Sequence, residues 1–238
     1  MKTIIIAAAL AVPGLAFAGN LEPAPQPVPI DPPAVYDWSG AYVGAFFGLE
    51  DTAADLTDLD GVSGGNFLIQ DIDADGVVLG AMAGHNWQRG NFVFGIEVDY
   101  TANGGSGSSD LDIVNLDETI EWKTNWSASL RARFGVAKDR TLFYGTAGVA
   151  TSDVTFGYLN MDGSGTVVEG DDRITDRING ITLGAGIEHA KTDRLILRGE
   201  VLYTDYSSFR EELTSVITSG TIYDPSTVTL RAAAVWKF

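Results

Sequence analysis

Eight charged residues stand at alternating positions within segments that are otherwise apolar or built from small residues, and the chemistry open to them is ion pairing. The set comprises Glu97, Asp99, Arg131, Arg133, Glu188, Arg198, Glu200 and Arg231. A carboxylate or guanidinium that is removed from water must be paired and hydrogen-bonded, or it costs several kcal/mol. We therefore examine which elements of the chain would bring these side chains into one enclosed space.

The two histidines do not indicate catalysis. His85 and His189 fall on outward faces near the ends of predicted strands. Neither shares a predicted face with a serine and a carboxylate, which a lipid-A hydrolase or an outer-membrane protease would require. We expect no enzyme activity, no catalytic residue and no cofactor.

The acidic run DIDADG is the one sequence that resembles a metal site. It matches the first half of a calcium loop, but Met82 stands at the position where the loop needs a bidentate glutamate. We therefore expect no metal site, and the run remains a weak candidate through Asp71, Asp73 and Asp75.

The last twelve residues, Thr227 to Phe238, are typical of a strand that meets lipid. Successive side chains of a strand point to opposite faces. One face is wholly apolar and comprises Val228, Leu230, Ala232, Ala234, Trp236 and Phe238. The other face carries Arg231 and Lys237. An apolar face that ends in aromatic residues suits a strand whose last turn lies at a membrane interface.

The same period of two recurs in seven earlier segments, and a helical period appears nowhere over a comparable length. These segments span residues 39–49, 76–88, 92–100, 119–136, 141–151, 178–190 and 195–206. The outward face of 141–151 is the least clearly marked. Connections of three to five residues alternate with long ones near 50–76, 101–119, 153–174 and 205–226. This rhythm predicts an all-β, eight-stranded antiparallel transmembrane barrel of the up-and-down type, with short turns in the periplasm and long loops outside.

A soluble eight-stranded barrel is the alternative, but it would bury the apolar face and expose the polar one. Here Leu79, Leu130 and Leu183 lie on the aromatic-capped face, which we predict to face lipid.

The interior of such a small barrel is just wide enough to be filled by side chains. Because opposite charges recur at similar distances from the short turns, we predict a lumen cluster of Glu97, Arg131, Glu200 and Arg231, with Asp99, Arg133, Arg198 and Glu188 around it.

The N-terminus has the pattern of an export signal. Lys2 precedes the apolar run Ile4–Val12, and the Ala16–Ala18 segment predicts cleavage between Ala18 and Gly19. Six of the eight prolines lie between Pro23 and Pro33, which favours an extended tether. We predict a signal peptide over 1–18, a Pro-rich periplasmic tether over 19–37 and the barrel over 38–238.

The segments VYDWSGAYVGAFFG, GHNWQRGNFVFGIEVDY, SLRARFGVA, TLFYGTAGVA, GAGIEH and RGEVLYTDY, followed by the ending WKF, resemble the small eight-stranded outer-membrane surface proteins of alphaproteobacteria, relatives of the OmpA and OmpX barrels. The resemblance implies that both termini are periplasmic. It also implies insertion by the barrel-assembly machinery, which would read the terminal aromatic strand with Trp236 and Phe238. The chain departs from the pattern at His85 and His189, where relatives more often carry tyrosine.

The charge distribution bears on partners. The formal net charge of −17 argues against nucleic acid, and the segments 50–76, 101–121, 153–176 and 205–226 hold 23 of the 32 acidic residues. A charge run is usually a solvated face. Alternatively, these carboxylates could recruit divalent cations shared with lipopolysaccharide phosphates, since hard cations favour oxygen ligands.

We expect a monomer in the Gram-negative outer membrane. Three functions follow from these patterns. The first is a structural surface protein that supports the envelope through its lipid-embedded wall and acidic loops. The second is a small-solute channel gated by the lumen ion pairs. The third is an adhesin or surface antigen that contacts a host through its loops, although no motif identifies a ligand.

Overall fold

The computed structural model describes residues 36–58, 67–102, 106–113, 116–161, 172–211 and 221–238. The predicted signal peptide, its cleavage site at Ala18 and Gly19, and the Pro-rich run lie outside the described residues. No helix within the described ranges is long and apolar enough to cross a membrane.

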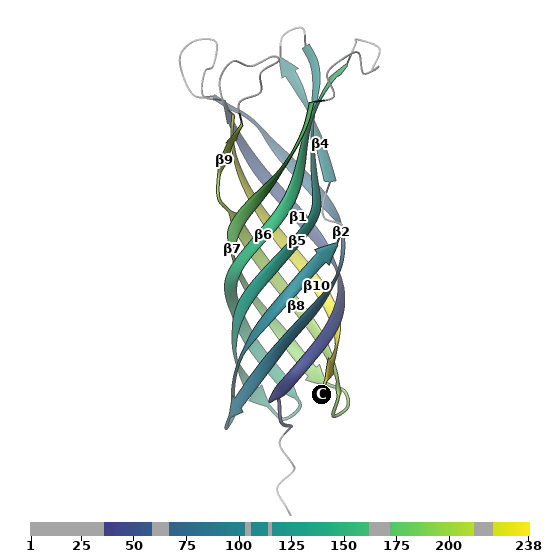
Figure 1. The fold of residues 1–238 in the computed structure, drawn as a ribbon, viewed down its shortest axis with the longest axis vertical. Coiled ribbons are helices and arrows are strands. Elements are labelled where there is room, and N and C mark those ends of the chain that lie inside the picture. The colour runs from purple at the N-terminus through teal and green to yellow at the C-terminus, as the bar shows by residue number, and fades with distance from the viewer. Residues whose placement is uncertain (1–35, 59–66, 103–105, 114–115, 162–171, 212–220) are drawn as a thin grey trace, which may run out of the picture. The chain divides into compact units, whose positions relative to one another are not determined.

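The alternating segments form antiparallel strands that are hydrogen-bonded into one sheet (Figure 1). Their bounds are Gly40–Asp58 (β1), Phe67–Arg89 (β2), Phe92–Ala102 (β3), Ser106–Ile113 (β4), Leu116–Lys138 (β5), Thr141–Met161 (β6), Asp172–Ala190 (β7), Leu195–Tyr206 (β8), Phe209–Glu211 (β9) and Thr221–Lys237 (β10).

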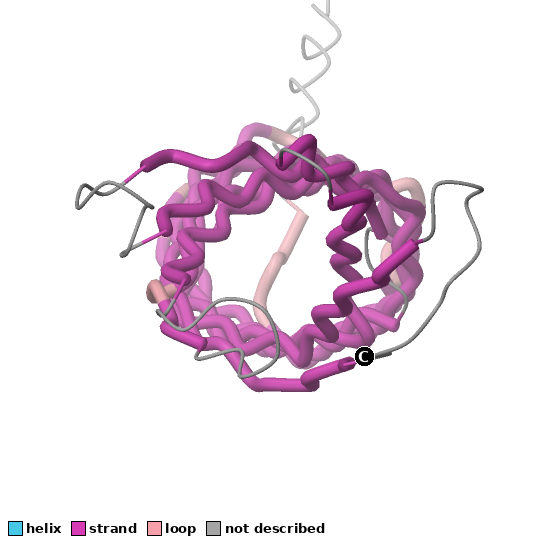
Figure 2. Tube along the Cα trace, turned by 90° about the horizontal axis from the view of Figure 1, so that it is seen from above, coloured by secondary structure: helices cyan, strands magenta, loops and turns pink. Residues whose placement is uncertain are grey.

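The sheet closes on itself because β1 pairs with both β2 and β10. Two of the ten segments prolong a preceding strand. β4 follows β3 along the same neighbour β5, and β9 follows β8 along β10. The barrel wall therefore has eight strands, as predicted from the sequence, and Figure 2 shows it as a closed ring.

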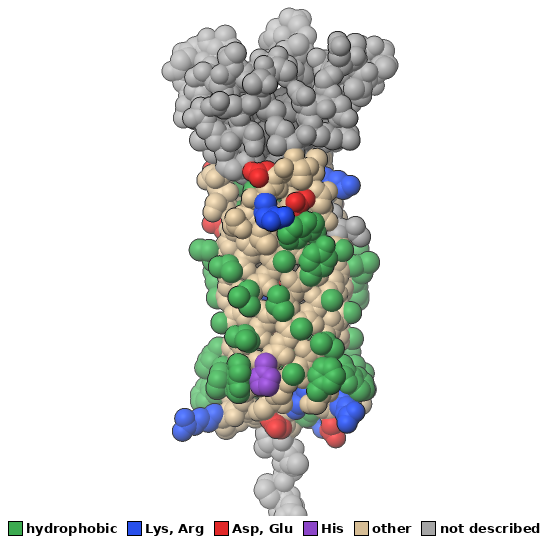
Figure 3. Space-filling view, in the orientation of Figure 1, with side chains coloured by type: hydrophobic (Ala, Val, Ile, Leu, Met, Phe, Trp, Pro, Cys, Tyr) green, Lys and Arg blue, Asp and Glu red, His purple; other side chains and the backbone are tan. Residues whose placement is uncertain are grey.

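The apolar faces point outward, which confirms the predicted assignment. Leu130 is 57% exposed and Leu183 53% exposed, whereas Glu97 is 1% exposed. The hydrophobic side chains form a band around the wall (Figure 3). On β6, Phe143 and Val149 point outward while Leu142 and Tyr144 point inward, which resolves the face that its sequence left unclear.

The strands are longer than the sequence pattern indicates, and the predicted long loops are largely strand. β1 continues to Asp58 and β6 to Met161, while β5 begins at Leu116. DIDADG also lies within β2, where Asp75 pairs with Asp51 in the register. The loop prediction was wrong because a hydrogen-bonded ladder continues beyond the lipid band without an apolar face to reveal it in the sequence.

Two ends of the barrel can be distinguished. The short-turn end holds the connections 89–92, 138–141 and 190–195, and the long-hairpin end holds the extended strand pairs. Near the short-turn end the lumen contains an apolar layer. Its members include Val93, Ala137, Leu142, Ala190, Ile196 and Val235, all buried.

Candidate functional site

The structure brings all eight predicted charged residues together in the lumen, and each is at most 5% exposed. They come from β3, β5, β7, β8 and β10. The strand register creates three opposite-charge pairs directly, because Glu97 lies opposite Arg131, Glu188 opposite Arg198, and Glu200 opposite Arg231. The remaining contacts cross the lumen. We refer to these eight residues as the lumen network.

One half of the lumen network is centred on Arg131. Its Nη2 lies 2.6 Å from Glu97 Oε1 and 2.8 Å from Asp99 Oδ2, and its Nη1 lies 3.1 Å from Glu200 Oε1. Arg231 Nε donates to Glu200 Oε2 at 2.7 Å. Ser129 completes this half by donating its hydroxyl to Asp99 Oδ2 at 2.6 Å. Every carboxylate here therefore has at least two donors.

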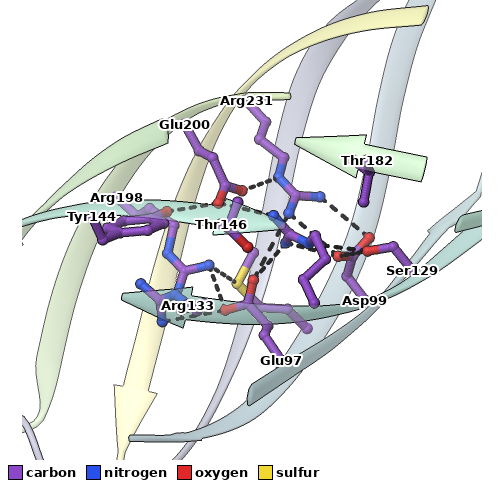
Figure 4. Close-up of polar contacts among 12 residues, drawn as sticks. Glu97, Asp99, Ser129, Arg133, Tyr144, Thr146, Thr182, Arg198, Glu200 and Arg231 are labelled. Carbon is purple, nitrogen blue, oxygen red and sulfur yellow. Dashed lines mark hydrogen bonds and ion pairs between the residues drawn. The ribbon is translucent and has the colours of Figure 1, made fainter. Parts of the chain in front are cut away.

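The other half is built around Glu188. Arg133 Nη2 and Arg198 Nε donate to Glu188 Oε1 at 2.7 Å and 2.6 Å. Arg198 Nη1 also donates to Glu97 Oε2 at 2.6 Å. Glu97 thus joins the halves, with one oxygen bound to Arg131 and the other to Arg198 (Figure 4). The prediction had instead placed Arg133, Arg198 and Glu188 around a single centre.

Two tyrosines hydrogen-bond to the lumen network, and the sequence did not reveal them as its partners. The Tyr42 hydroxyl donates to Glu97 Oε2 at 2.7 Å and accepts from Arg133 Nη1 at 2.7 Å. The Tyr144 hydroxyl donates to Glu200 Oε1 at 2.8 Å, and the Arg133 guanidinium lies 4.1 Å from the centre of its ring. For Tyr42 the available signal was a large polar aromatic residue on an inward face that otherwise holds only glycine and Phe46 up to Gly48.

The lumen network is suited to filling space with fixed charge. Four carboxylates and four guanidinium groups balance, so the cluster has no net charge to attract an ion. Among the described residues, no group of three or more His, Cys, Asp or Glu side chains could hold a metal ion. What the arrangement offers is a rigid, neutral obstruction inside the barrel.

A second closure lies at the short-turn end, where residues Tyr36–Ser39 form what we call the N-terminal seal. Trp38 is 1% exposed and Tyr36 7% exposed. Figure 2 shows a loop segment, in pink, crossing the opening of the barrel. The predicted boundary between tether and barrel at residues 37 and 38 therefore falls inside the seal, which belongs to the folded barrel.

The seal contacts several elements of the short-turn end at once. The Tyr36 hydroxyl donates to the backbone oxygen of Asp193 at 3.0 Å, and the Arg140 guanidinium lies 5.0 Å from the Tyr36 ring centre. The backbone N–H of Trp38 donates to Gln88 Oε1 at 2.7 Å. Lys237 Nζ donates to the backbone oxygen of Asp37. The first folded residues are thereby tied to two turns, to β2 and to the last strand.

The seal gives a prediction for alkaline pH. Burial raises the pKa of the Tyr36 phenol above its ordinary value near 10. A raised pKa means that the docked state holds the proton more tightly, so its stabilisation is complete below the ordinary pKa and is lost as the pH rises through the raised one. We expect residues 36–39 to stay docked at neutral pH and to be released above pH ~10. Proteolysis of the N-terminal segment measured against pH checks this.

Tyr36→Phe provides the control for that titration. It keeps the ring in contact with Arg140 but cannot ionise. If residues 36–39 were released equally steeply with rising pH in Tyr36→Phe, ionisation of the Tyr36 phenol would not be the cause of the release.

The other predicted site residues lie away from the lumen network. His189 is exposed, and its Nδ1 lies 3.1 Å from Thr141 Oγ1. The ring of His85 packs 4.6 Å from that of Trp87 on the outer wall, so both histidines face outward as expected. Trp236 and Phe238 are 46% and 73% exposed at the short-turn end. Their role as an assembly signal stays a prediction.

The weak calcium candidate has no loop geometry. The backbone of Asp71, Asp73 and Asp75 is extended within β2 and paired with β1. The side chains of Asp71 and Asp73 lie outside the described part of the structure, and that of Asp75 is exposed.

The sequence of this barrel is similar to those of known outer-membrane proteins. The sequence matches the family described as "Outer membrane protein beta-barrel domain" over residues 5–238. It is 33% identical over 219 residues to the 31 kDa outer-membrane immunogenic protein of Brucella melitensis biotype 1, covering 86% of this chain and 87% of that one. It is 30% identical over 194 residues to the 22 kDa outer membrane protein of Rhizobium leguminosarum bv. viciae, covering 80% and 74%.

A similar solved structure is the outer membrane protein OprG of Pseudomonas aeruginosa. The TM-score is 0.49 at 12% sequence identity, with 84% of this chain and 97% of that chain covered.

Proposed function

Because the chain belongs to the outer-membrane β-barrel protein family, and so lies in the outer membrane, we propose that it acts as a structural surface protein that supports envelope integrity. In this proposal the short-turn end faces the periplasm and the long hairpins face outward. The protein works as a monomer whose wall contacts lipid and whose acidic hairpins contact lipopolysaccharide, in part through divalent cations. Its insertion depends on the barrel-assembly machinery.

The observation that carries this proposal is the filled lumen. The lumen network occupies the interior with eight charged side chains that are at most 5% exposed, and the N-terminal seal covers the periplasmic mouth. A cavity of about 30 Å³ borders Asp99 and Arg231 on one side of the network. That volume holds roughly one water molecule, which is far too little for a solute path.

The structural role predicts a pair of results that are measured separately. A deletion strain should take up dyes faster and become more sensitive to detergent, and the wild-type gene should restore both properties. The purified protein in planar bilayers should show no large steady conductance. A strong conductance from the wild-type protein would contradict the structural role directly.

A channel gated by the lumen network is the second candidate, favoured by the fact that one layer of ion pairs forms the obstruction. Glu200→Gln tests it, because Glu200 accepts from Arg131, Tyr144 and Arg231. We expect the variant to stay closed, since the amide has the same volume and the other side chains still fill the space. Arg194→Gln, which alters one exposed charge outside the lumen and outside the N-terminal seal, is the control. Steady conductance in Glu200→Gln alone would favour the gate.

The third candidate is contact with a host through the long hairpins. Its support is that the Brucella relatives are named immunogenic proteins of the outer membrane. The described residues provide no pocket chemistry that specifies a ligand for such contact.

A further inference from the structure

Two exposed cations lie on the outer wall at the upper edge of the hydrophobic band, within one sector of the barrel. Lys123 is on β5 and Arg177 is on β7, with β6 between them. The register aligns Trp126, Asp153 and Arg177 in one row, and Lys123, Thr155 and Thr175 in the next. A bulge after Thr124 adds Asn125 between the rows. We call Lys123, Asn125 and Arg177 the outer cationic patch.

Among the described residues, the Arg177 guanidinium has no hydrogen-bond acceptor. Its guanidinium lies 5.2 Å from the centre of the Trp126 ring, and it makes no ion pair with any residue that the structure describes. Asp153 stands opposite Arg177 in the register, but Asp153 Oδ1 accepts instead from Asn125 Nδ2 at 2.9 Å. Asp176 Oδ1 accepts from the backbone N–H of Arg177 at 2.7 Å. A guanidinium carries five N–H donors, so this one is available to an external acceptor.

The patch lies at the level of lipid headgroups. Trp126 stacks on Tyr100 with ring centres 5.9 Å apart, and these are the last large apolar side chains on the outer faces of β5 and β3. Toward the other end, Leu130 and Val98 are 57% and 51% exposed. Aromatic residues mark the boundary between hydrocarbon and headgroups. Figure 3 shows Lys and Arg side chains directly beyond the hydrophobic band.

At the same height on the outer wall, the other strands carry negative charge. Outward carboxylates occur on other strands just beyond their last exposed apolar residues, and they are Asp51, Asp75, Asp205 and Asp224. An anionic headgroup would be repelled along those strands unless a cation intervened. The β5–β7 sector also carries one outward carboxylate, Asp153, but Asn125 donates to it and two cations, Lys123 and Arg177, outnumber it. Among the described strands this sector is therefore the most favourable place at this height for direct binding of a phosphate.

We propose that the outer cationic patch binds the phosphate of a phosphorylated glycolipid in the outer leaflet. Arg177 donates to the phosphate oxygens as a planar guanidinium, and Lys123 supplies a second positive charge. Asn125 binds no phosphate itself, because its amide donates to Asp153 and Thr155, which keeps the Asp153 carboxylate occupied. The Trp126 indole holds the guanidinium and packs against the lipid at the boundary. This site requires the outer-membrane location but not a closed lumen, so it stands or falls independently of the structural role.

The test is a binding titration of the full mature protein in nanodiscs with lipid A that carries its phosphates, compared with enzymatically dephosphorylated lipid A. EDTA is present throughout, so that bridging divalent cations are removed. We expect phosphorylated lipid A to bind at least ~10-fold more tightly, and Arg177→Gln to abolish most of this preference, since a charge-assisted hydrogen bond contributes about one factor of ten or more. Native mass spectrometry measures the lipid bound per protein.

The controls separate the patch from general electrostatics and from phosphate alone. Arg140→Gln removes one cation at the short-turn end and should leave lipid A binding unchanged. Inorganic phosphate at equal concentration should not compete, because it lacks the part of the ligand that contacts the wall. The proposal is overturned if both lipid A forms bind equally, if Arg177→Gln and Arg140→Gln behave alike, if EDTA abolishes wild-type binding, or if inorganic phosphate competes equally. Heat-modifiable migration on gels verifies that each variant is folded.

Discussion

Glu97→Gln is expected to lower the free energy of unfolding by about 3–5 kcal/mol, the range for removing one partner from a buried ion pair. Glu97 binds Arg131 and Arg198 through different oxygens and also accepts from the Tyr42 hydroxyl. A neutral amide presents one acceptor oxygen in place of two and places an N–H group against a buried guanidinium, so Arg131 or Arg198 loses one of its charged acceptors while it stays buried. Urea unfolding in lipid vesicles, followed by tryptophan fluorescence, measures the change.

Asp193→Asn provides the matched control for Glu97→Gln. It neutralises a carboxylate that pairs with Arg140 at 3.1 Å, but the Asp193 side chain is 91% exposed. Exposed pairs contribute about 0–1 kcal/mol. Equal effects of the two substitutions would show that Glu97 does not join the halves of the lumen network.

Leu130→Arg is expected to destabilise the folded barrel in a bilayer by about 2–4 kcal/mol, as for an arginine at the midplane of a lipid-facing wall. Leu130 is 57% exposed and lies midway between Trp126 and Phe134 on the outward face of β5. Its neighbours across the strands, Val98 and Val149, are equally outward and apolar. The guanidinium would therefore have only hydrocarbon around it. Equilibrium unfolding in vesicles measures the loss.

Leu130→Ala separates the charge effect from lost contact in that experiment. It shortens the side chain without adding charge, and it should have a much smaller effect than Leu130→Arg. If the arginine variant were as stable as the alanine variant, the outward face of β5 would not lie in lipid.

The strands and their faces could be predicted from the sequence because a period of two is a local property. Phe92, Phe94 and Ile96 alternate with inward residues on β3, and each falls on the predicted side. The membership of the lumen network followed from the same rule, since every charge on an inward position had to be enclosed. These conclusions needed no knowledge of how neighbouring strands are shifted.

The partners within the lumen network could not be predicted, because they depend on the shear of the closed barrel. Counting along each strand grouped Glu97 with Arg131 and Glu200, but it did not reveal that Glu97 also reaches Arg198 across the lumen at 2.6 Å. Tyr144 was missed because it lies in the segment whose faces were the least clear. Pair choice in a barrel is set by tilt and register, which a single strand does not encode.

The long-hairpin strands and the N-terminal seal escaped prediction for a different reason. Beyond the lipid band both faces of a hairpin are polar, so β1 and β2 lose their periodic signal while their hydrogen bonds continue. The seal is only four residues long and has no period. Tyr36 and Trp38 are buried by contacts with residues fifty or more positions away, such as Asp193 and Gln88.

The seal also determines how the two ends of the folded chain are fastened. β1 and β10 are the one neighbouring pair in the wall that no chain connection joins, and they meet only through the ladder from Tyr42 and Lys237 to Asp58 and Thr221. Lys237 additionally donates to the backbone oxygen of Asp37, so this seam is fastened at the short-turn end by a residue that precedes the first strand. Cargo fused to the N-terminus therefore has to be joined ahead of Tyr36 to leave this contact intact.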